Sequence, residues 1–402
     1  MLDASIQDNI SIQDNISIQA NISIQAIVVI SIQAIVVKFR NPALLTSKNH
    51  PKNKNIMLQR IIALLATLTV CGPTFVMAQP AADKVQAHGQ APYLGKIKSI
   101  TTAAVVIFTN GRDQTVSVNE LANISFADEP ETLSQIRRLV KSGQYEKALM
   151  ELKPLANSTL RDKRIQHDVL FYQALATSRL ALAGASELSA AGKMMFQFKK
   201  SAPDSHHYFE AVDVLGRLAM AMEQYKAATN FFRELAGAPW KDFQLKASVL
   251  AAEAMLNQGN HTEAIGQFRM ALDSNVPGPV AERQKALAGV GLAVCLAETG
   301  KADEGRQTLL KILEIAGPRD IELNAKAHNA LGQCYLQQKN NKQALLAFLH
   351  TDLLYSGQRD AHAEALYHLT KLWGQLEKSD RARQARNTLK SSYARSRWAK
   401  QL

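Results

Sequence analysis

The sequence predicts a mainly α-helical protein, an α-solenoid preceded by a small β module. Three observations lead to this prediction. From Glu131 to the C-terminus, apolar residues recur with the 3.6-residue period of amphipathic helices. Within that region, small and aromatic residues return together every 36 to 41 positions. Before it, residues 93–130 contain four short β-branched runs separated by turn residues.

The composition is that of a globular protein. The chain has 402 residues, of which 47% are hydrophobic and 20% charged. Its net charge is +12, and about +9 of this lies after Ala78. That excess is moderate for more than 300 residues, so the sequence does not predict a nucleic-acid-binding protein.

Residues 1–56 begin with a tandem repeat. Its unit is first the six residues SIQDNI and then grows to the eight residues SIQAIVVI. A repeat that changes length loses the register that stacked units require. We therefore interpret residues 1–56 as non-native upstream sequence and expect translation to start at Met57.

Residues 57–78 have the order of parts of a secretory signal peptide. Met57 and Arg60 form a short positive start, residues 61–70 are apolar, and small residues precede Ala78. Cleavage is expected between Ala78 and Gln79. Ten apolar residues are too few to cross a bilayer, so we predict a periplasmic or secreted protein with no transmembrane span in the mature chain.

A lipid anchor is the alternative fate of this segment. Leu68-Thr69-Val70-Cys71 resembles a lipobox, the signal for lipid attachment to cysteine. Val70 stands where that signal has Gly, Ala or Ser. The sequence therefore argues against anchoring at Cys71.

The mature chain is predicted to start with a flexible leader and a β module. Residues 79–92 are rich in Ala, Gln and Pro and show no periodicity, so we predict a leader without regular structure. In residues 93–130, Asn110-Gly111 between two β-branched runs indicates a hairpin. About four short strands in under 40 residues resemble SH3-like or Sm-like modules.

Residues 131–402 carry the helical repeat, which is clearest in ALGQCYLQQKNNKQALLAFLHTD. Gly332 and Ala344 are small because two antiparallel helices are expected to cross closest there, while Tyr335 and Phe348 fill the wider gaps. This spacing resembles the tetratricopeptide repeat (TPR) family. The resemblance implies a TPR-type α-solenoid of about six to seven helix pairs.

Other repeats show the same markers. Corresponding small and large residues are Gly216, Ala228 and Phe232, then Ala252, Ala264 and Phe268, then Ala293, Gly305 and Leu309. Turns between paired helices are expected at Gly143, Gly184, Glu223, Gly259, Gly300, Lys339 and Glu377. The closing segment YARSRWA resembles the ends of TPR proteins of the bacterial periplasm and outer membrane. This second resemblance agrees with the predicted export.

The sequence contains no motif for catalysis or for a cofactor. Cys295 and Cys334 occupy equivalent places in consecutive repeats, roughly 8–10 Å apart if the helices pack normally, so we expect buried thiols without a disulfide. His206 and His207 are adjacent, but only Asp204 and Glu210 lie nearby in sequence. We predict a helix start with exposed imidazoles and no metal site.

Two sets of residues are candidates for binding. The first set projects from the Gly/Ala crossing points into a concave groove, and suits an extended peptide. It comprises Asp213, Arg217, Lys246, Glu253, Asn329, Gln333 and Gln337. The second is a basic surface near the C-terminus, suited to an anionic envelope surface. It comprises Arg381, Arg383, Arg386, Lys390, Arg395 and Arg397.

We therefore predict an exported, non-catalytic bacterial TPR scaffold that binds a protein or peptide in its groove. Two alternatives stay open. The chain could be a structural subunit of a cell-envelope complex that uses its convex face and basic C-terminal helix. It could also be a cell-wall glycan-binding accessory protein that uses the β module.

Overall fold

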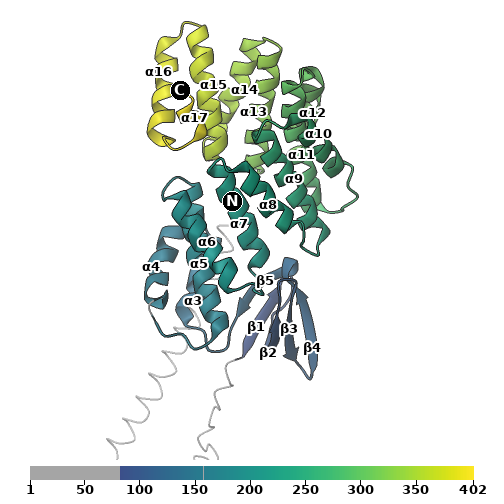
Figure 1. The fold of residues 1–402 in the computed structure, drawn as a ribbon, viewed down its shortest axis with the longest axis vertical. Coiled ribbons are helices and arrows are strands. Elements are labelled where there is room, and N and C mark those ends of the chain that lie inside the picture. The colour runs from purple at the N-terminus through teal and green to yellow at the C-terminus, as the bar shows by residue number, and fades with distance from the viewer. Residues whose placement is uncertain (1–81, 157) are drawn as a thin grey trace, which may run out of the picture. The chain divides into compact units, whose positions relative to one another are not determined.

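A computed structural model describes residues 82–156 and 158–402, all of which belong to one compact unit, Ala78–Leu402. The predictions for residues 1–56, for the signal peptide at 57–78 and for Cys71 lie outside the described residues. A small sheet comes first, and a series of paired helices follows it (Figure 1).

The sheet has five antiparallel strands in the order β4-β3-β2-β1-β5. The strands are β1 (Asp83–Ala87), β2 (Tyr93–Ile100), β3 (Ala104–Thr109), β4 (Arg112–Ser117) and β5 (Leu121–Ser125). The fifth strand follows a short 3₁₀ turn and returns to pair with the first, which curls the sheet as in SH3-like folds. Asn110 and Gly111 both have positive φ, so the predicted hairpin is confirmed.

Strand β1 corrects the predicted flexible leader at residues 79–92. Val85 and Ala87 alternate into the core of the sheet. Asp83 is buried, and its carboxylate accepts hydrogen bonds from the amides of Ile97 at 2.8 Å and Ala127 at 2.9 Å. The alternation spans only five residues among Ala and Gln, so it is too short to show as a period in the sequence.

Seven antiparallel helix pairs and one short final helix follow in the described residues, in agreement with the predicted six to seven pairs. The first three pairs are α3 (Glu131–Lys141) with α4 (Tyr145–Ala156), α5 (Lys163–Leu182) with α6 (Leu188–Ser201), and α7 (Tyr208–Ala221) with α8 (Tyr225–Leu235). The next two are α9 (Lys241–Asn257) with α10 (His261–Leu272) and α11 (Pro279–Glu298) with α12 (Ala302–Ile315). The last are α13 (Ile321–Gln337) with α14 (Asn341–Leu354) and α15 (Arg359–Gln375) with α16 (Ser379–Ser392), before α17 (Arg397–Lys400).

The turn within each pair has one repeated geometry. All seven predicted turn residues have positive φ, including the non-glycine residues Glu223, Lys339 and Glu377. After each of them, the next amide donates to the carbonyl five positions earlier, as Asn340 does to Tyr335 at 2.8 Å. This is the left-handed C-terminal cap of an α-helix. It reverses the chain within three residues in six of the pairs and within five residues between α5 and α6.

The crossing points pack as predicted. The small residues Ala228, Ala252, Ala264, Ala293 and Ala344 are fully buried. Where a repeat has glycine, the partner ring or backbone fills the space: a Cβ on Gly216 would lie 2.3 Å from the ring of Phe232, and one on Gly305 would lie 2.7 Å from the carbonyl oxygen of Ala293. The marker residues therefore report helix packing.

The β module and the first helices share one hydrophobic core. Val85, Ile107 and Ile124 of the sheet belong to the same buried cluster as Leu133 of α3 and Ile165 of α5. The boundary predicted at residue 130 thus separates two kinds of structure within a continuous core. A fragment of residues 93–130 would lack both β1 and this helical cover.

None of the helices between residues 82 and 402 that the structure describes has the length and apolar character needed to cross a bilayer.

Candidate functional site

The first helices of successive pairs line the inner face of the solenoid. α9 contacts α11, and α11 contacts α13. Lys326 of α13 nevertheless reaches Glu253 of α9, two pairs away, with 2.8 Å between Nζ and the carboxylate. A side chain can span that separation only where the inner face is concave. The predicted groove is this face.

At α7 and α9, the groove residues are paired with one another. Asp213 is buried, and its carboxylate accepts from Arg217 Nε at 3.0 Å and from Lys246 Nζ at 2.8 Å. Burial disfavours its ionised form, but the two cations outweigh burial and hold the pKa of Asp213 below its usual value. The three side chains together therefore carry one net positive charge.

The centre of the groove is an ion-pair chain from α9 to α13. Lys326 lies between Glu253 and Glu322, and Arg283 of α11 binds Glu322 at 2.8 Å and Asp320 at 2.6 Å. Burial lowers the pKa of Lys326, yet the two carboxylates raise it overall. All five side chains have a partner of opposite charge, so these ion pairs link neighbouring repeats to one another.

The C-terminal part of the groove is different because uncharged amides meet a partly buried acid, Glu364, there. Asn329 is almost fully buried and donates to the carbonyl of Ala361 at 2.7 Å and to Glu364 at 2.9 Å. Gln333 donates to the same carboxylate. Burial raises the pKa of Glu364, since Arg397, Asn329 and Gln333 compensate only part of the desolvation.

A shallow pocket of about 260 Å³ opens beside these residues. Its lining is Glu298, Gln333, Leu336, Gln337, His368 and Trp398. Gln337 is exposed, and the only hydrogen bond of its side chain within the described part of the chain is a long one of 3.3 Å to Glu298. Of the seven predicted groove residues, Gln333 and Gln337 line this pocket, whereas the other five contact intramolecular partners away from it.

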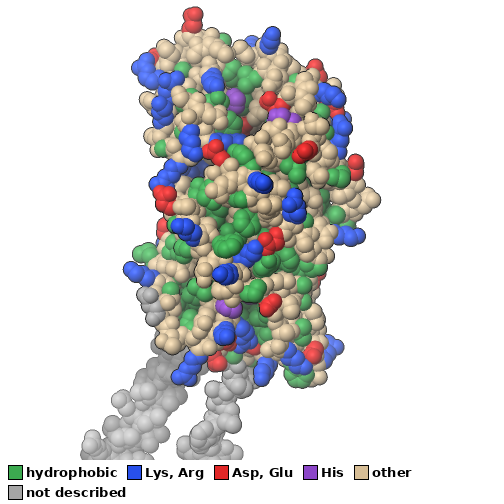
Figure 2. Space-filling view, in the orientation of Figure 1, with side chains coloured by type: hydrophobic (Ala, Val, Ile, Leu, Met, Phe, Trp, Pro, Cys, Tyr) green, Lys and Arg blue, Asp and Glu red, His purple; other side chains and the backbone are tan. Residues whose placement is uncertain are grey.

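The predicted basic surface divides into two groups. Arg381, Arg383, Arg386 and Lys390 lie on α16 and are exposed. Arg395 and Arg397 instead contact early repeats: Arg395 pairs with Glu187 of the α5–α6 loop at 2.8 Å, and Arg397 donates to Asn257 of α9. Figure 2 shows basic side chains gathered along the edge of the C-terminal part of the molecule.

The inward group closes the solenoid on itself. Besides Arg395 and Arg397, Lys400 pairs with Glu223 of the α7–α8 turn at 2.8 Å. These partners lie 140 to 208 positions earlier in the chain. This closure could not be predicted from the sequence, because no residue near YARSRWA indicates which distant residue it contacts.

The histidine pair lies in a buried cluster, so the prediction of exposed imidazoles is wrong. His206 and His207 are each 7% exposed, and Asp168 of α5 is 1% exposed. Phe171 stacks on the ring of His207 with 3.7 Å between centroids. The pair precedes α7, and packing of that helix against α5 covers both rings.

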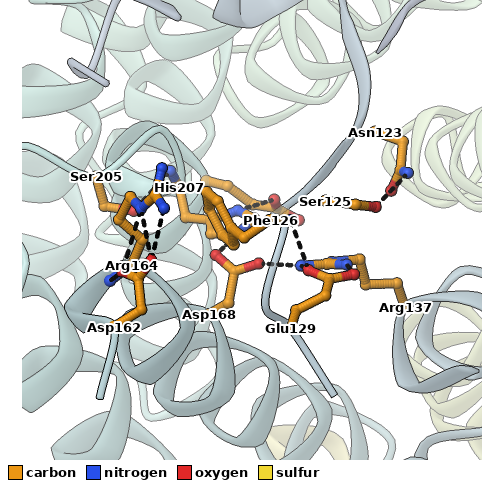
Figure 3. Close-up of polar contacts among 11 residues, drawn as sticks. Asn123, Ser125, Phe126, Glu129, Arg137, Asp162, Arg164, Asp168, Ser205 and His207 are labelled. Carbon is orange, nitrogen blue, oxygen red and sulfur yellow. Dashed lines mark hydrogen bonds and ion pairs between the residues drawn. The ribbon is translucent and has the colours of Figure 1, made fainter. Parts of the chain in front are cut away.

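Charged groups surround Asp168 in this cluster. Arg137 of α3 binds Asp168 Oδ2 at 2.7 Å and also holds Glu129, with 2.6 Å from Nη1 to Oε1 (Figure 3). Burial raises the pKa of Asp168, but His207, His206 and Arg137 more than reverse this, so the carboxylate stays ionised. Asp168 and Arg137 could not be predicted as neighbours of the histidines. Arg137 lies 31 positions before Asp168, and Asp168 lies still farther before His207.

The thiols offer no nucleophile. Cys295 and Cys334 are free and buried, as predicted. Burial raises the pKa of Cys295 to about 12 and that of Cys334 to about 11. Both therefore remain protonated at neutral pH and act as small apolar side chains.

These observations define the class of the fold: a TPR-like α-solenoid with an N-terminal five-stranded sheet. No family model matches the chain, and no curated protein matches it.

Several solved structures are similar to the chain in fold. The Rap protein complexed with Competence and Sporulation Factor has 14% identity and a TM-score of 0.49, and the match covers 66% of this chain and 76% of that one. A tetratricopeptide repeat protein from Parabacteroides merdae has 14% identity and a TM-score of 0.48, and the match covers 67% of this chain and 96% of that one. NprR in complex with its cognate peptide NprX has 16% identity and a TM-score of 0.43, and the match covers 66% of this chain and 80% of that one.

Proposed function

We propose that the chain is an exported, non-catalytic scaffold that binds a protein or peptide at the C-terminal part of its groove. The pocket beside Gln337 carries this proposal. Elsewhere along the groove the charged residues are occupied by one another, whereas here amide and carboxylate groups of Gln337 and Glu298 remain exposed next to Leu336 and Trp398. An apolar floor with a few polar groups at its rim is the usual composition of a binding pocket.

Export is part of the same proposal. It rests on the sequence of residues 57–78, and N-terminal sequencing of the protein from cells tests it. We expect the mature chain to start at Gln79 and to be found in the periplasm or the medium. A mature chain that starts at Met1, or that stays in the cytoplasm, would contradict the envelope function.

Two glutamines provide a matched test of the pocket. A photo-crosslinking residue placed at position 337 should capture a partner in cells, whereas the same residue at position 307 of α12, which is exposed on a second helix, should not. With the partner purified, Gln337→Arg should weaken binding at least tenfold and Gln307→Arg should leave it unchanged. Equal capture at both positions, or equal binding by both variants, would exclude the pocket.

The basic α16 supports a second function, that of an assembly subunit. Arg386 and Lys390 are exposed and form no ion pair with any described residue, and Arg381 stacks on Trp373 at 4.8 Å. Free cations on one helix favour an anionic partner or surface, and such binding falls with added salt. If the triple variant R381Q/R383Q/R386Q abolishes salt-sensitive binding while Gln337→Arg has no effect, the assembly role replaces the groove.

A further inference from the structure

Three potential metal ligands converge in the buried cluster between α5 and α7. One ring nitrogen each of His206 and His207 and one carboxylate oxygen of Asp168 all lie within 4.8 Å of one another. All three side chains are more than nine-tenths buried. They come from two elements that are 38 positions apart, so only the packing of α7 against α5 brings them together.

Hydrogen bonding leaves this cluster incomplete. The Nε2 atoms of both His206 and His207 are buried and have no hydrogen-bond partner among the residues that the structure describes. Between His207 Nε2 and Asp168 Oδ1 the distance is 3.4 Å, longer than the roughly 2.7–2.9 Å of a charge-assisted hydrogen bond. Buried polar atoms without a partner cost free energy, and a group bound between these atoms would remove that cost.

We propose that Asp168, His206 and His207 bind a divalent transition-metal ion of the zinc type. In tetrahedral coordination, bonds of about 2.0–2.2 Å place two ligand atoms roughly 3.3–3.5 Å apart. The 3.4 Å between His207 Nε2 and Asp168 Oδ1 has this value. Two imidazoles and a carboxylate are a common donor set for such ions, and the fourth position is left for a water molecule.

The groups around the ligands are arranged to orient them. Glu210 Oε2 lies 3.8 Å from His207 Nδ1, which directs the Nε2 atom of that ring toward Asp168. Arg137 binds the other carboxylate oxygen, Oδ2, and leaves Oδ1 for the ion. Ligating carboxylates are usually held in this way by a second hydrogen-bonding group.

The charges allow an added cation. Arg137 carries one positive charge and faces the two carboxylates of Asp168 and Glu129, which leaves one negative charge beside the two imidazoles. The ion would join α5 to the start of α7 and act as a structural tie.

The test uses the untagged chain from Gln79 to Leu402, stripped of metal with a chelator. Zn²⁺ added to the native protein, or present during refolding, should bind at one equivalent and raise the melting temperature. Co²⁺ at the same site should give visible ligand-field absorption, and zinc-edge X-ray absorption should report histidine ligation in the unmodified protein. If the wild-type protein binds no equivalent of Zn²⁺ by either route, the proposal is wrong and the cluster is an ion-pair network only.

Variants assign the ligands. His206→Gln and Asp168→Asn should each weaken Zn²⁺ binding at least a hundredfold and remove the rise in melting temperature, while Glu210→Gln should weaken it about tenfold. The control is H328Q/H350Q, which removes a second stacked histidine pair with 4.6 Å between ring centroids and should leave binding unchanged. If Asp168→Asn fails to fold, the zinc-edge X-ray absorption of the wild-type protein decides whether histidine binds the ion. Binding that survives His206→Gln in a folded protein, or is lost in the control, overturns the assignment.

Discussion

The ring of Phe348 on α14 fills the space where a side chain on Gly332 of α13 would lie. A Cβ built on Gly332 would be 2.6 Å from the ring, well inside van der Waals contact. Gly216 and Phe232 have the same relationship 116 positions earlier, with a shortest distance of 2.3 Å. The glycine is thus required by the partner ring.

Gly332→Ala should therefore destabilise the protein. The ring of Phe348 is fully buried and cannot move away without disturbing the helix pair, so the added methyl group should cost about 1–3 kcal/mol in urea denaturation. Gly266 of α10 is the control, because nothing lies within 4 Å of its Cβ position. Gly266→Ala should stabilise the protein by about 0.5–1 kcal/mol, since alanine favours the helix. Equal effects of the two substitutions would refute the packing argument.

Arg137 should be the most sensitive charged residue in the N-terminal part. Replacing it with Met leaves the buried carboxylates of Asp168 and Glu129 without their cation, which should cost about 3–5 kcal/mol in metal-free buffer. Arg138, the next residue, is exposed and bonds only to Ser134 on its own helix. Arg138→Met should change the free energy of unfolding by no more than about 0.5 kcal/mol. A small effect of Arg137→Met would mean that water reaches the cluster.

Much of the fold could be predicted because it depends on local spacing. A left-handed turn and a small residue at the helix crossing are each set by a few neighbouring positions, so Lys339 and Gly332 could be assigned from sequence. Strand β1 could not, because it is short and its core position depends on pairing with β2 and β5.

The candidate sites could be predicted only in part, for the same physical reason. Projection from the crossing points locates the inner face, but it does not show that Lys326 pairs with Glu253, 73 positions away, or that Asp168 meets His207. These contacts follow from the curvature of the whole stack. A single sequence shows which residues can ionise but does not show which of them neutralise one another.

Acid should destabilise the protein partly through His368. Burial lowers the pKa of this imidazole to about 4, and the nearby Lys371 adds to the shift. Its unfolded pKa is about 6.5, so the unfolded state binds the proton first and stability is lost as the pH falls from about 6.5 toward 4. The ring stacks on Phe348 with 4.5 Å between centroids, so His368→Phe keeps the packing and removes the titration. Urea midpoints at pH 7.5 and 5 should differ less for this variant than for the wild type. An unchanged difference would show that His368 does not contribute.

The closure of the solenoid should open when Arg397 is lost. Arg397 donates to Asn257, and Asp360 and Glu364 also hold its charge, against the cost of burial. The pairs on either side of it, Arg395 with Glu187 and Lys400 with Glu223, are largely exposed and should contribute at most about 1 kcal/mol each. Closure therefore depends mainly on Arg397.

Arg397→Ala should speed amide hydrogen exchange at the C-terminal end of α9 and in α17, because both helices lose the contact between Arg397 and Asn257. Added salt should enhance the effect, because it screens the two flanking ion pairs. Arg386→Ala is the control, since this exposed arginine has no ion-pair partner among the described residues. The groove pocket includes Trp398, the neighbour of Arg397, so the same variant should also change partner binding at Gln337. Exchange at α9 that is equal in both variants would mean that the closure is held by packing of Trp398 against Tyr367, whose ring centroids lie 5.3 Å apart, and not by the arginine.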